Sequence, residues 1–370
     1  MSPALSLYLD MVRIAAALFV VYAHSNLRFL LPEVLPLAEF GHSAVVVFFV
    51  LSGYVIAFAS DSRERDAIDY AAARVSRIAP LALFSVLAAL TADSIGRWLA
   101  PELYQAIPAD RLLLRLLLSA GLLNELWWLS VMPFSNVPQW SLCYEAVYYL
   151  LFGIAVHARA GWRGPALAAV AIIAGPKILL LAPCWLAGVA AWRFRGEDRW
   201  RPTGAALAWL GTAALFWLYH RLDLMRAFAQ DALAPHAGPW LMTHLAFSKY
   251  FAADWLLALV VAVNFVAARS LLTRARAPAA AVRAVAARLG MLTFAIYILH
   301  FPLLYLGGAL ALGVPAGGPK WAAVVALALG LAMLIGTLVD RARPGLRAWL
   351  LALGHRVRLG RNGTAGSRIA

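Results

Sequence analysis

Three polar side chains whose types suit proton transfer and charge stabilisation lie in the first apolar stretch, LDMVRIAAALFVVYAHS. Asp10 and Arg13 are three residues apart, so in a helix they share a face and can pair. Arg13 and His24 are eleven apart, which is close to three turns and places them on one face, about 16 Å apart along the axis. The spacing predicts a guanidinium and an imidazole on one stripe of a helix. A structural ion pair plus a histidine at the helix end would give the same pattern.

The segment AAARVSRIAP carries two arginines, Arg74 and Arg77, one turn apart if the segment is helical. Guanidinium groups at this spacing can hold phosphate groups through paired hydrogen bonds. Arginines beside an apolar stretch are also typical of segments that only fix the orientation of a membrane protein. The residues alone leave both interpretations open.

The segment VPQWSLCYEAVYYLLF places a carboxylate, Glu145, near the start of another apolar stretch. From its position we expect Glu145 at the same depth as His24, where a carboxylate can orient an imidazole that acts as a general base. A glutamate that extends to the membrane surface is the alternative. Trp140, one turn earlier, suits an anchor at the outer interface.

Other polar or small residues could either line a cavity or only pack. Ser52 with Gly53 is typical of close helix packing, and Tyr297 and His300 share one helix face, where a satisfied core histidine is the alternative. The residues that we expect to line a cavity besides His24, Glu145 and Arg13 are Asp10, Ser52, Trp140, Ser141, Tyr297 and His300.

No metal site is predicted. The two cysteines, Cys143 and Cys184, lie in apolar surroundings and form no CxxC motif. The sequence has no HExxH, P-loop, GxSxG or GxGxxG motif in the required context.

The composition is that of an integral membrane protein. The chain has 370 residues, of which 63% are hydrophobic and 14% charged, against about 25% charged in soluble proteins. Apolar runs alternate with short arginine-rich breaks, and runs of about 17–25 residues can cross a bilayer as helices. The net charge of +14 is spread over these breaks rather than gathered in one patch, which argues against a nucleic-acid partner.

These runs predict an all-α, polytopic transmembrane bundle of about ten helices. We expect spans at residues 6–25, 43–60, 80–98, 141–158, 166–181, 183–195, 204–220, 251–268, 289–306 and 321–339. Segment 111–130 contains two arginines, Asn124 and Glu125, so we expect an interfacial or re-entrant helix there.

The distribution of basic residues predicts that both termini are cytoplasmic. With this orientation, 22 of the 32 Lys and Arg residues fall on the cytoplasmic side and 8 on the other. The first apolar run contains Asp10 and Arg13 and no basic residue precedes it, so we expect no cleaved signal peptide. Residues 1–345 are predicted to form one transmembrane domain and residues 346–370 a disordered, basic, cytoplasmic tail near membrane lipids.

Together the segments LDMVRIAAALFVVYAHS, FFVLSGYVI, RVSRIAP, QWSLCYEAVYYLLF and TFAIYILHFPL resemble the acyltransferase family 3 membrane proteins. They occur in the family's order and spacing over nearly the whole chain. Val46, where many members have an acidic residue, and Cys143-Tyr144 before Glu145 depart from the commonest pattern.

The resemblance implies an O-acyltransferase in the bacterial inner membrane, with cytoplasmic acyl-CoA, most often acetyl-CoA, as donor and no metal cofactor. Arg74 and Arg77 would hold the donor's phosphates. His24 would take the acceptor's proton or carry the acyl group, Glu145 would orient it, and Arg13 would steer the pantetheine arm or stabilise charge on the thioester oxygen. The acceptor would be a hydroxyl of a polysaccharide or other glycan at the outer face.

Two other classes of protein remain open from the sequence. A transporter or flippase of lipid-linked sugars would also have buried charges, although no paired halves are visible. A structural scaffold would not need charged residues within its spans. Acceptor identity, the acyl group and the oligomeric state cannot be read from the residues.

Overall fold

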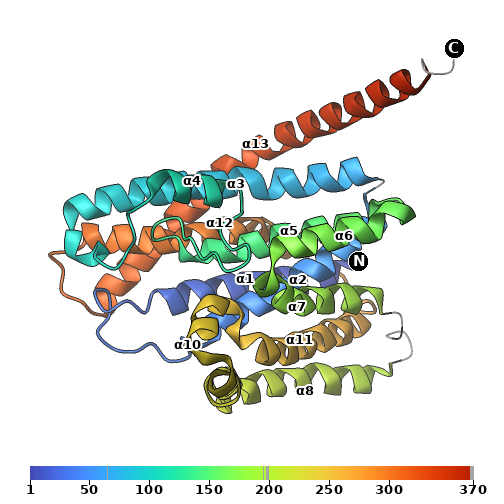
Figure 1. The fold of residues 1–370 in the computed structure, drawn as a ribbon. Coiled ribbons are helices and arrows are strands. Elements are labelled where there is room, and N and C mark those ends of the chain that lie inside the picture. Colours follow the sequence, from blue (N-terminus) through green and yellow to red (C-terminus); the bar gives the residue numbers. More distant parts are fainter. Residues whose placement is uncertain (65, 195, 197–199, 367–370) are drawn as a thin grey trace.

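The computed structural model describes residues 1–64, 66–194, 196 and 200–366, without the side chains of 357–366. Every regular element in these ranges is helical, as predicted (Figure 1). The longer helices are α1 (Pro3–His24), α2 (Phe40–Ser62), α3 (Ala67–Leu99), α5 (Trp140–His157), α6 (Ala160–Ala174), α7 (Pro176–Arg193), α8 (Pro202–Arg221), α11 (Phe251–Leu272), α12 (Ala280–Leu310) and α13 (Gly318–Gly366). Shorter helices are α4 (Leu112–Ala120), α9 (Leu224–Arg226) and α10 (Ala234–Leu245), with short 3-10 or π turns at Pro101–Tyr104, Val137–Gln139, Ala227–Leu233 and Ala246–Tyr250.

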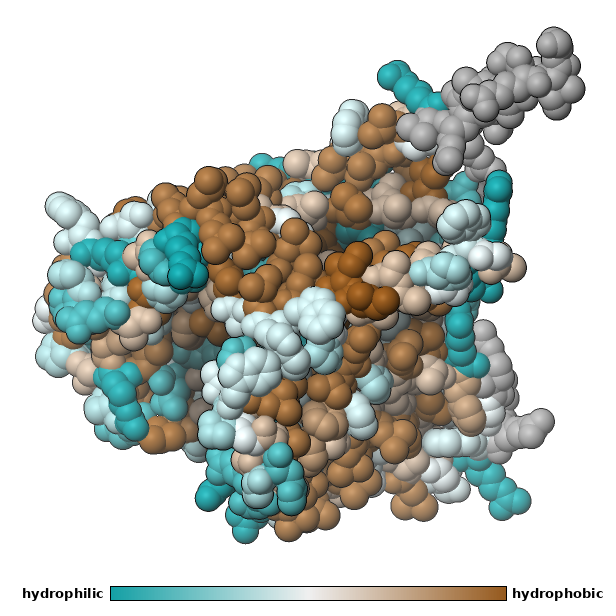
Figure 2. All heavy atoms as spheres, viewed as in Figure 1, coloured by the Kyte–Doolittle hydropathy of each residue, from teal (hydrophilic) through white to brown (hydrophobic). Residues whose placement is uncertain are grey.

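The helices form one bundle with apolar sides. The long helices run roughly side by side, and both chain ends lie at the same end of the bundle (Figure 1). Hydrophilic residues gather at the two ends, whereas the sides are mainly hydrophobic (Figure 2). In the described ranges, six helical stretches are long and apolar enough to cross a membrane, or up to seven if one bent pair counts as a span.

Each of the ten predicted spans overlaps a longer helix, but ten crossings are not confirmed. Helices α5 and α8 have 18 and 20 residues and are not among the six, because polar and aromatic side chains lower their hydropathy. Residue 195, the end of the predicted span 183–195, lies outside the described residues. The number of spans and the side of the termini therefore stay predictions.

The bent pair is α6 and α7, whose axes turn by 120° at a short break. Gly175 occupies the break with φ of 79°, a conformation that favours glycine, and Pro176 starts α7. A side chain at Gly175 would also collide with Trp127, since its Cβ would lie 2.6 Å from the Trp127 Cα. The chain therefore makes a sharp turn at Gly175, and the segment after α4 packs against this turn through Trp127.

Segment 111–130 does not form a membrane-spanning helix. Its helix, α4, has nine residues, whereas a span needs about 20. The irregular chain that follows α4 is held by Glu125, whose carboxylate lies 2.6 Å from the Lys177 ammonium, with both side chains fully buried. The Ser130 hydroxyl donates a second hydrogen bond to Glu125, at 2.9 Å.

The predicted disorder of the tail is corrected by the structure. Helix α13 continues through residues 346–366; residues 367–370 lie outside the described residues. Leu346, Trp349, Leu350 and Leu353 recur at the spacing of one helix face, a pattern that favours an amphipathic helix. Gly354 of this extension approaches the side chain of Ile68 at the start of α3.

Helices α2 and α7 approach each other through glycines. A Cβ on Gly188 would lie 1.9 Å from the Val50 carbonyl oxygen, and one on Gly53 would lie 2.0 Å from the Trp185 carbonyl oxygen. The close packing predicted for Ser52 and Gly53 is therefore confirmed at Gly53. Because backbone meets backbone here, no side chain can move aside to make room.

We predict that Gly188→Ala lowers the free energy of unfolding by about 1–3 kcal/mol, because the added methyl group forces α2 and α7 apart. The matched control is Gly330→Ala in α13, where a Cβ meets nothing within 4 Å; it should stabilise by about 0.5–1 kcal/mol through helix propensity. Unfolding of the purified protein in detergent measures both. Equal effects of the two substitutions would contradict the close contact.

Candidate active site

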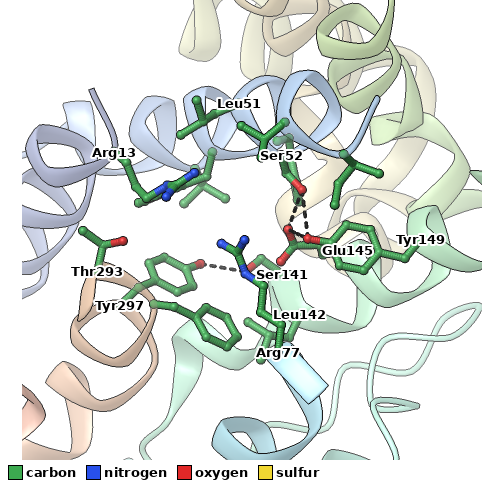
Figure 3. A pocket seen from close by; sticks show the side chains of 16 residues that line it. Arg13, Leu51, Ser52, Arg77, Ser141, Leu142, Glu145, Tyr149, Thr293 and Tyr297 are labelled. Carbon is green, nitrogen blue, oxygen red and sulfur yellow. Dashed lines mark hydrogen bonds between the residues drawn. The ribbon is translucent and has the colours of Figure 1, made fainter. Parts of the chain in front are cut away.

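A partly open cavity lies among α1, α2, α3, α5 and α12. Its walls are apolar except for one set of polar side chains (Figure 3), which are Arg13, Ser52, Arg77, Ser141, Glu145, Tyr149, Thr293 and Tyr297. Six of these were predicted from the sequence to be site residues: Arg13, Ser52, Arg77, Ser141, Glu145 and Tyr297. A few convergent polar groups in a mainly apolar cavity are typical of a binding site.

Glu145 is bonded on one side of this cavity to hydroxyl groups. The Ser52 and Tyr149 hydroxyls each lie 2.6 Å from the same carboxylate oxygen, and the Trp185 indole N–H donates to Ser52 at 3.2 Å. Tyr149 is one helical turn after Glu145, so this contact follows the i, i+4 spacing. These hydrogen bonds offset the free-energy cost of placing the Glu145 carboxylate within the membrane.

Arg13 and Arg77 enter the cavity from different helices, α1 and α3, and Figure 3 shows both guanidinium groups directed into it. Arg13 lies 3.6 Å from Asp10, which confirms the predicted pair. Both arginines also line an adjoining cavity of about 580 Å³, together with Ser76, Asp340 and Arg343. Three guanidinium groups from three helices thus surround connected space, an arrangement suited to a polyanion.

Arg74 is not part of this arginine group. Its guanidinium is ion-paired with Glu64 and lies 5.2 Å from the ring centre of Tyr70. It lines a separate groove between α3 and α5. Positions three apart on a helix differ by about 60° around its axis, which is enough to direct Arg74 and Arg77 into different spaces.

His24 is paired with His300 and not with Glu145 as expected. The Nδ1 atom of His24 lies 2.8 Å from Nε2 of His300, and the two rings are stacked with centres 5.1 Å apart. The hydrogen bonds of Glu145 go to Ser52 and Tyr149. The expected contact rested on equal depth of His24 and Glu145 in the membrane. Equal depth does not determine whether the two side chains point toward each other.

The hydrogen bonds of His300 determine the tautomers of the pair. His300 Nδ1 lies 3.0 Å from the Ile296 carbonyl oxygen, which can only accept, so Nδ1 carries the proton. In the neutral ring, Nε2 of His300 then accepts from Nδ1 of His24. This arrangement leaves the lone pair of His24 on Nε2, as a general base requires.

Tyr297 connects the histidine pair with the cavity. Its hydroxyl lies 2.8 Å from the Ser141 hydroxyl, its ring lines the cavity, and its ring centre is 6.4 Å from that of His300. Trp140, in contrast, is buried and stacked on Phe247 with ring centres 4.3 Å apart. It is therefore neither an exposed interface anchor nor a cavity residue.

Sequence reasoning missed several polar cavity residues, among them Tyr149, Thr293 and Arg343, and it missed the role of His300. Tyr149 could have been found from its i+4 spacing to Glu145. Arg343 looked like one of many basic residues beyond the last span, and nothing in its spacing distinguishes it. His300 was a cavity candidate, but its pairing with His24 joins positions 276 residues apart.

In the described part of the chain, no group of three or more His, Cys, Asp or Glu side chains could hold a metal ion. The polar groups that line the cavity are hydroxyls, one carboxylate and guanidinium groups. Such a set can bind anions, donate hydrogen bonds and stabilise negative charge.

We predict that Glu64→Gln or Arg74→Gln alone lowers stability by about 3–5 kcal/mol, because each leaves a buried charge without its partner. The double variant should lose less than the sum of the two. Thermal unfolding in detergent for the four proteins gives the coupling energy. Additive losses would show that the ion pair does not contribute.

Comparison with known proteins gives a family for this chain. A family model described as "Acyltransferase domain" matches residues 6–339. A curated protein from Streptomyces mycarofaciens, "Acyltransferase MdmB", is 27% identical over 338 residues, which cover 82% of this chain and 79% of that protein. No solved structure matches. The matched range contains every cavity residue named above except Asp340 and Arg343.

Proposed function

The chain belongs to the acyltransferase 3 family, and from that premise we propose that it transfers an acyl group, most often acetyl, from cytoplasmic acyl-CoA to a hydroxyl of a glycan outside the bacterial inner membrane. The observation that carries this proposal is the His24–His300 pair, which leaves a lone pair on Nε2 of His24 and is connected through Tyr297 to an arginine-lined cavity. Acyl transfer from a phosphorylated donor requires a general base near the acceptor hydroxyl and anion-binding groups near the donor's phosphates.

The donor's phosphates would bind to Arg77, Arg13 and Arg343. These residues line connected cavities, and guanidinium groups bind phosphate oxygens through paired hydrogen bonds. We assign this role to Arg77 together with Arg343 rather than to Arg74, because Arg74 lines a different groove and is paired with a buried carboxylate, whereas the pair of Arg343 with Asp340 is partly exposed and 3.6 Å long.

In the proposed reaction, Nε2 of His24 takes the proton of the acceptor hydroxyl as the oxygen attacks the thioester carbonyl. The new C–O bond forms, the C–S bond breaks, and His24 returns the proton to the departing thiolate. Arg13, three helical turns from His24 on α1, would guide the pantetheine arm of the donor between the phosphate site and His24. His300 would act as a positioning residue in place of Glu145. Glu145, with Ser52 and Tyr149, would form a polar wall for the acyl end.

We predict that a deletion strain complemented with His24→Ala loses acyl esters on its surface glycans. Loss of a general base lowers the rate by about 10²–10⁴-fold. His300→Ala should give an intermediate loss, because the His24 ring loses its orientation but not its base. Ester-linked acyl groups released by mild alkali are measured against the wild-type gene.

The control is His244→Ala, since this half-buried histidine contacts only Trp240 of its own helix, through a hydrogen bond to the carbonyl and ring stacking. Full acylation with His24→Ala would overturn the assignment of the base. Unchanged esters in the deletion strain itself would overturn the glycan as acceptor.

We predict that Arg77→Gln and Arg343→Gln each raise the KM for acetyl-CoA by about 10- to 100-fold, since each removes a charged hydrogen bond worth about 1.5–3 kcal/mol. Release of free CoA by purified protein in vesicles, with a hydroxyl acceptor present, gives KM and kcat. Arg341→Gln, at an exposed position two residues away, is the matched control.

A KM for Arg77→Gln equal to that of the control would contradict the phosphate site. Binding of acetyl-CoA without acceptor-dependent release of CoA would favour a transporter over an acyltransferase.

A further inference from the structure

A large groove lies on the side of the bundle between α3 and α5, apart from the candidate active site. It encloses about 1060 Å³, and the surface there is mainly hydrophobic and hollowed (Figure 2). Small residues on facing sides of the two helices leave this space unfilled. They are Ala67, Ala71, Ala79, Ala146 and Ala158.

The length of the groove matches one leaflet of a bilayer. Residues 67–79 of α3 border it, which corresponds to about 18 Å along the helix. Half of the hydrocarbon core is about 15 Å thick. Helix α3 is one of the candidate spans, and the groove borders the part of α3 just before the stretch 80–98 that the sequence predicts to cross the bilayer, so the groove lies at the membrane interface.

One end of the groove is polar. Arg74 lines it and is bonded to Glu64, and the ring of Tyr70 lies between Arg74 and His157, 5.4 Å from the His157 ring centre. Three buried polar atoms at this end have no hydrogen-bond partner among the described residues, namely Nε of Arg74, Oε2 of Glu64 and Nε2 of His157. Arg159 follows directly at the start of α6.

These atoms differ in what they can bind. Nε of Arg74 is a donor, and Nε2 of His157 can donate in one tautomer, so both suit phosphate oxygens. Oε2 of Glu64 only accepts when ionised, so it suits a hydroxyl group. An apolar groove of this length that ends in such groups matches one acyl chain, the phosphate and a headgroup hydroxyl of a phospholipid.

We propose that this groove binds an anionic phospholipid with a hydroxyl-bearing headgroup, its chain along α3 and α5 and its headgroup at Arg74, Glu64 and His157. This site is distinct from the donor site and does not depend on the proposed reaction. The bound chain would contact Tyr149, whose ring lines both the groove and the active-site cavity and whose hydroxyl bonds Glu145. The lipid therefore supports one wall of that cavity.

The test uses the full-length protein in phosphatidylcholine vesicles containing a small fraction of phosphatidylglycerol with a photoreactive acyl chain. After illumination, we expect labelled peptides to concentrate in residues 67–79 and 146–158. Ala71→Trp and, as a second variant, Ala79→Trp should remove this labelling, because both positions are exposed in the groove and a large side chain fills it.

The matched control is Ala214→Trp, at an exposed position of α8 outside the groove, which should label as the wild type does. Labelling spread evenly over the apolar surface, or unchanged in both groove variants, would overturn the proposal. A monodisperse peak in size-exclusion chromatography checks that each variant is folded.

The headgroup is tested with the same photoreactive chain on phosphatidylcholine and on diacylglycerol. Phosphatidylglycerol should label the groove about tenfold more than diacylglycerol, which corresponds to one charged hydrogen bond, and more than phosphatidylcholine. This preference should disappear in the double variant Glu64→Gln/Arg74→Gln, which keeps the groove without its charges. Equal labelling by all three lipids in the wild type would overturn the headgroup assignment.

Discussion

A charged side chain inside a bilayer is stable only when another polar group of the protein compensates it. In this bundle the compensating group usually comes from a different helix or segment: Lys177 of α7 pairs with Glu125, and Glu145 of α5 bonds Ser52 of α2. Each such contact fixes how two elements are rotated against each other. The same contacts that make burial tolerable therefore also hold the reactive groups in position.

The sequence predicted the class of fold and most of the helices well, because hydropathy and length determine which segments can enter a membrane. It also predicted the Asp10–Arg13 pair, which depends on spacing within one helix. It did not predict that His24 would meet His300 or that Arg74 would separate from Arg77. Those outcomes depend on the rotation and tilt of helices against neighbours far away in the chain, which no local pattern encodes. Residues 346–366 differ from these cases because their helix was visible in a local pattern. Their apolar residues have the spacing of an amphipathic helix, but the prediction of disorder relied on their glycine and arginine content.

Two spaces with different chemistry meet at Tyr149. On one side its hydroxyl belongs to the polar wall of the cavity with Glu145 and Ser52. On the other side its ring borders the apolar groove near Arg74. A single aromatic residue thus lines both the arginine-lined cavity and the groove, so a change of its position would alter both spaces together.

The pairing of His24 with His300 also has a consequence for biosynthesis. The chain emerges from the ribosome beginning with its N-terminus, and 276 positions separate the two histidines. Helix α1 is synthesised early, but the His24 imidazole can contact His300 only after α12 has been made. Lys177, in contrast, meets a partner made only 52 positions earlier. A nascent chain that ends before α12 can therefore be inserted and partly packed. Its His24 still lacks the hydrogen bond to His300. The His24–His300 pair forms only after α12 has been made.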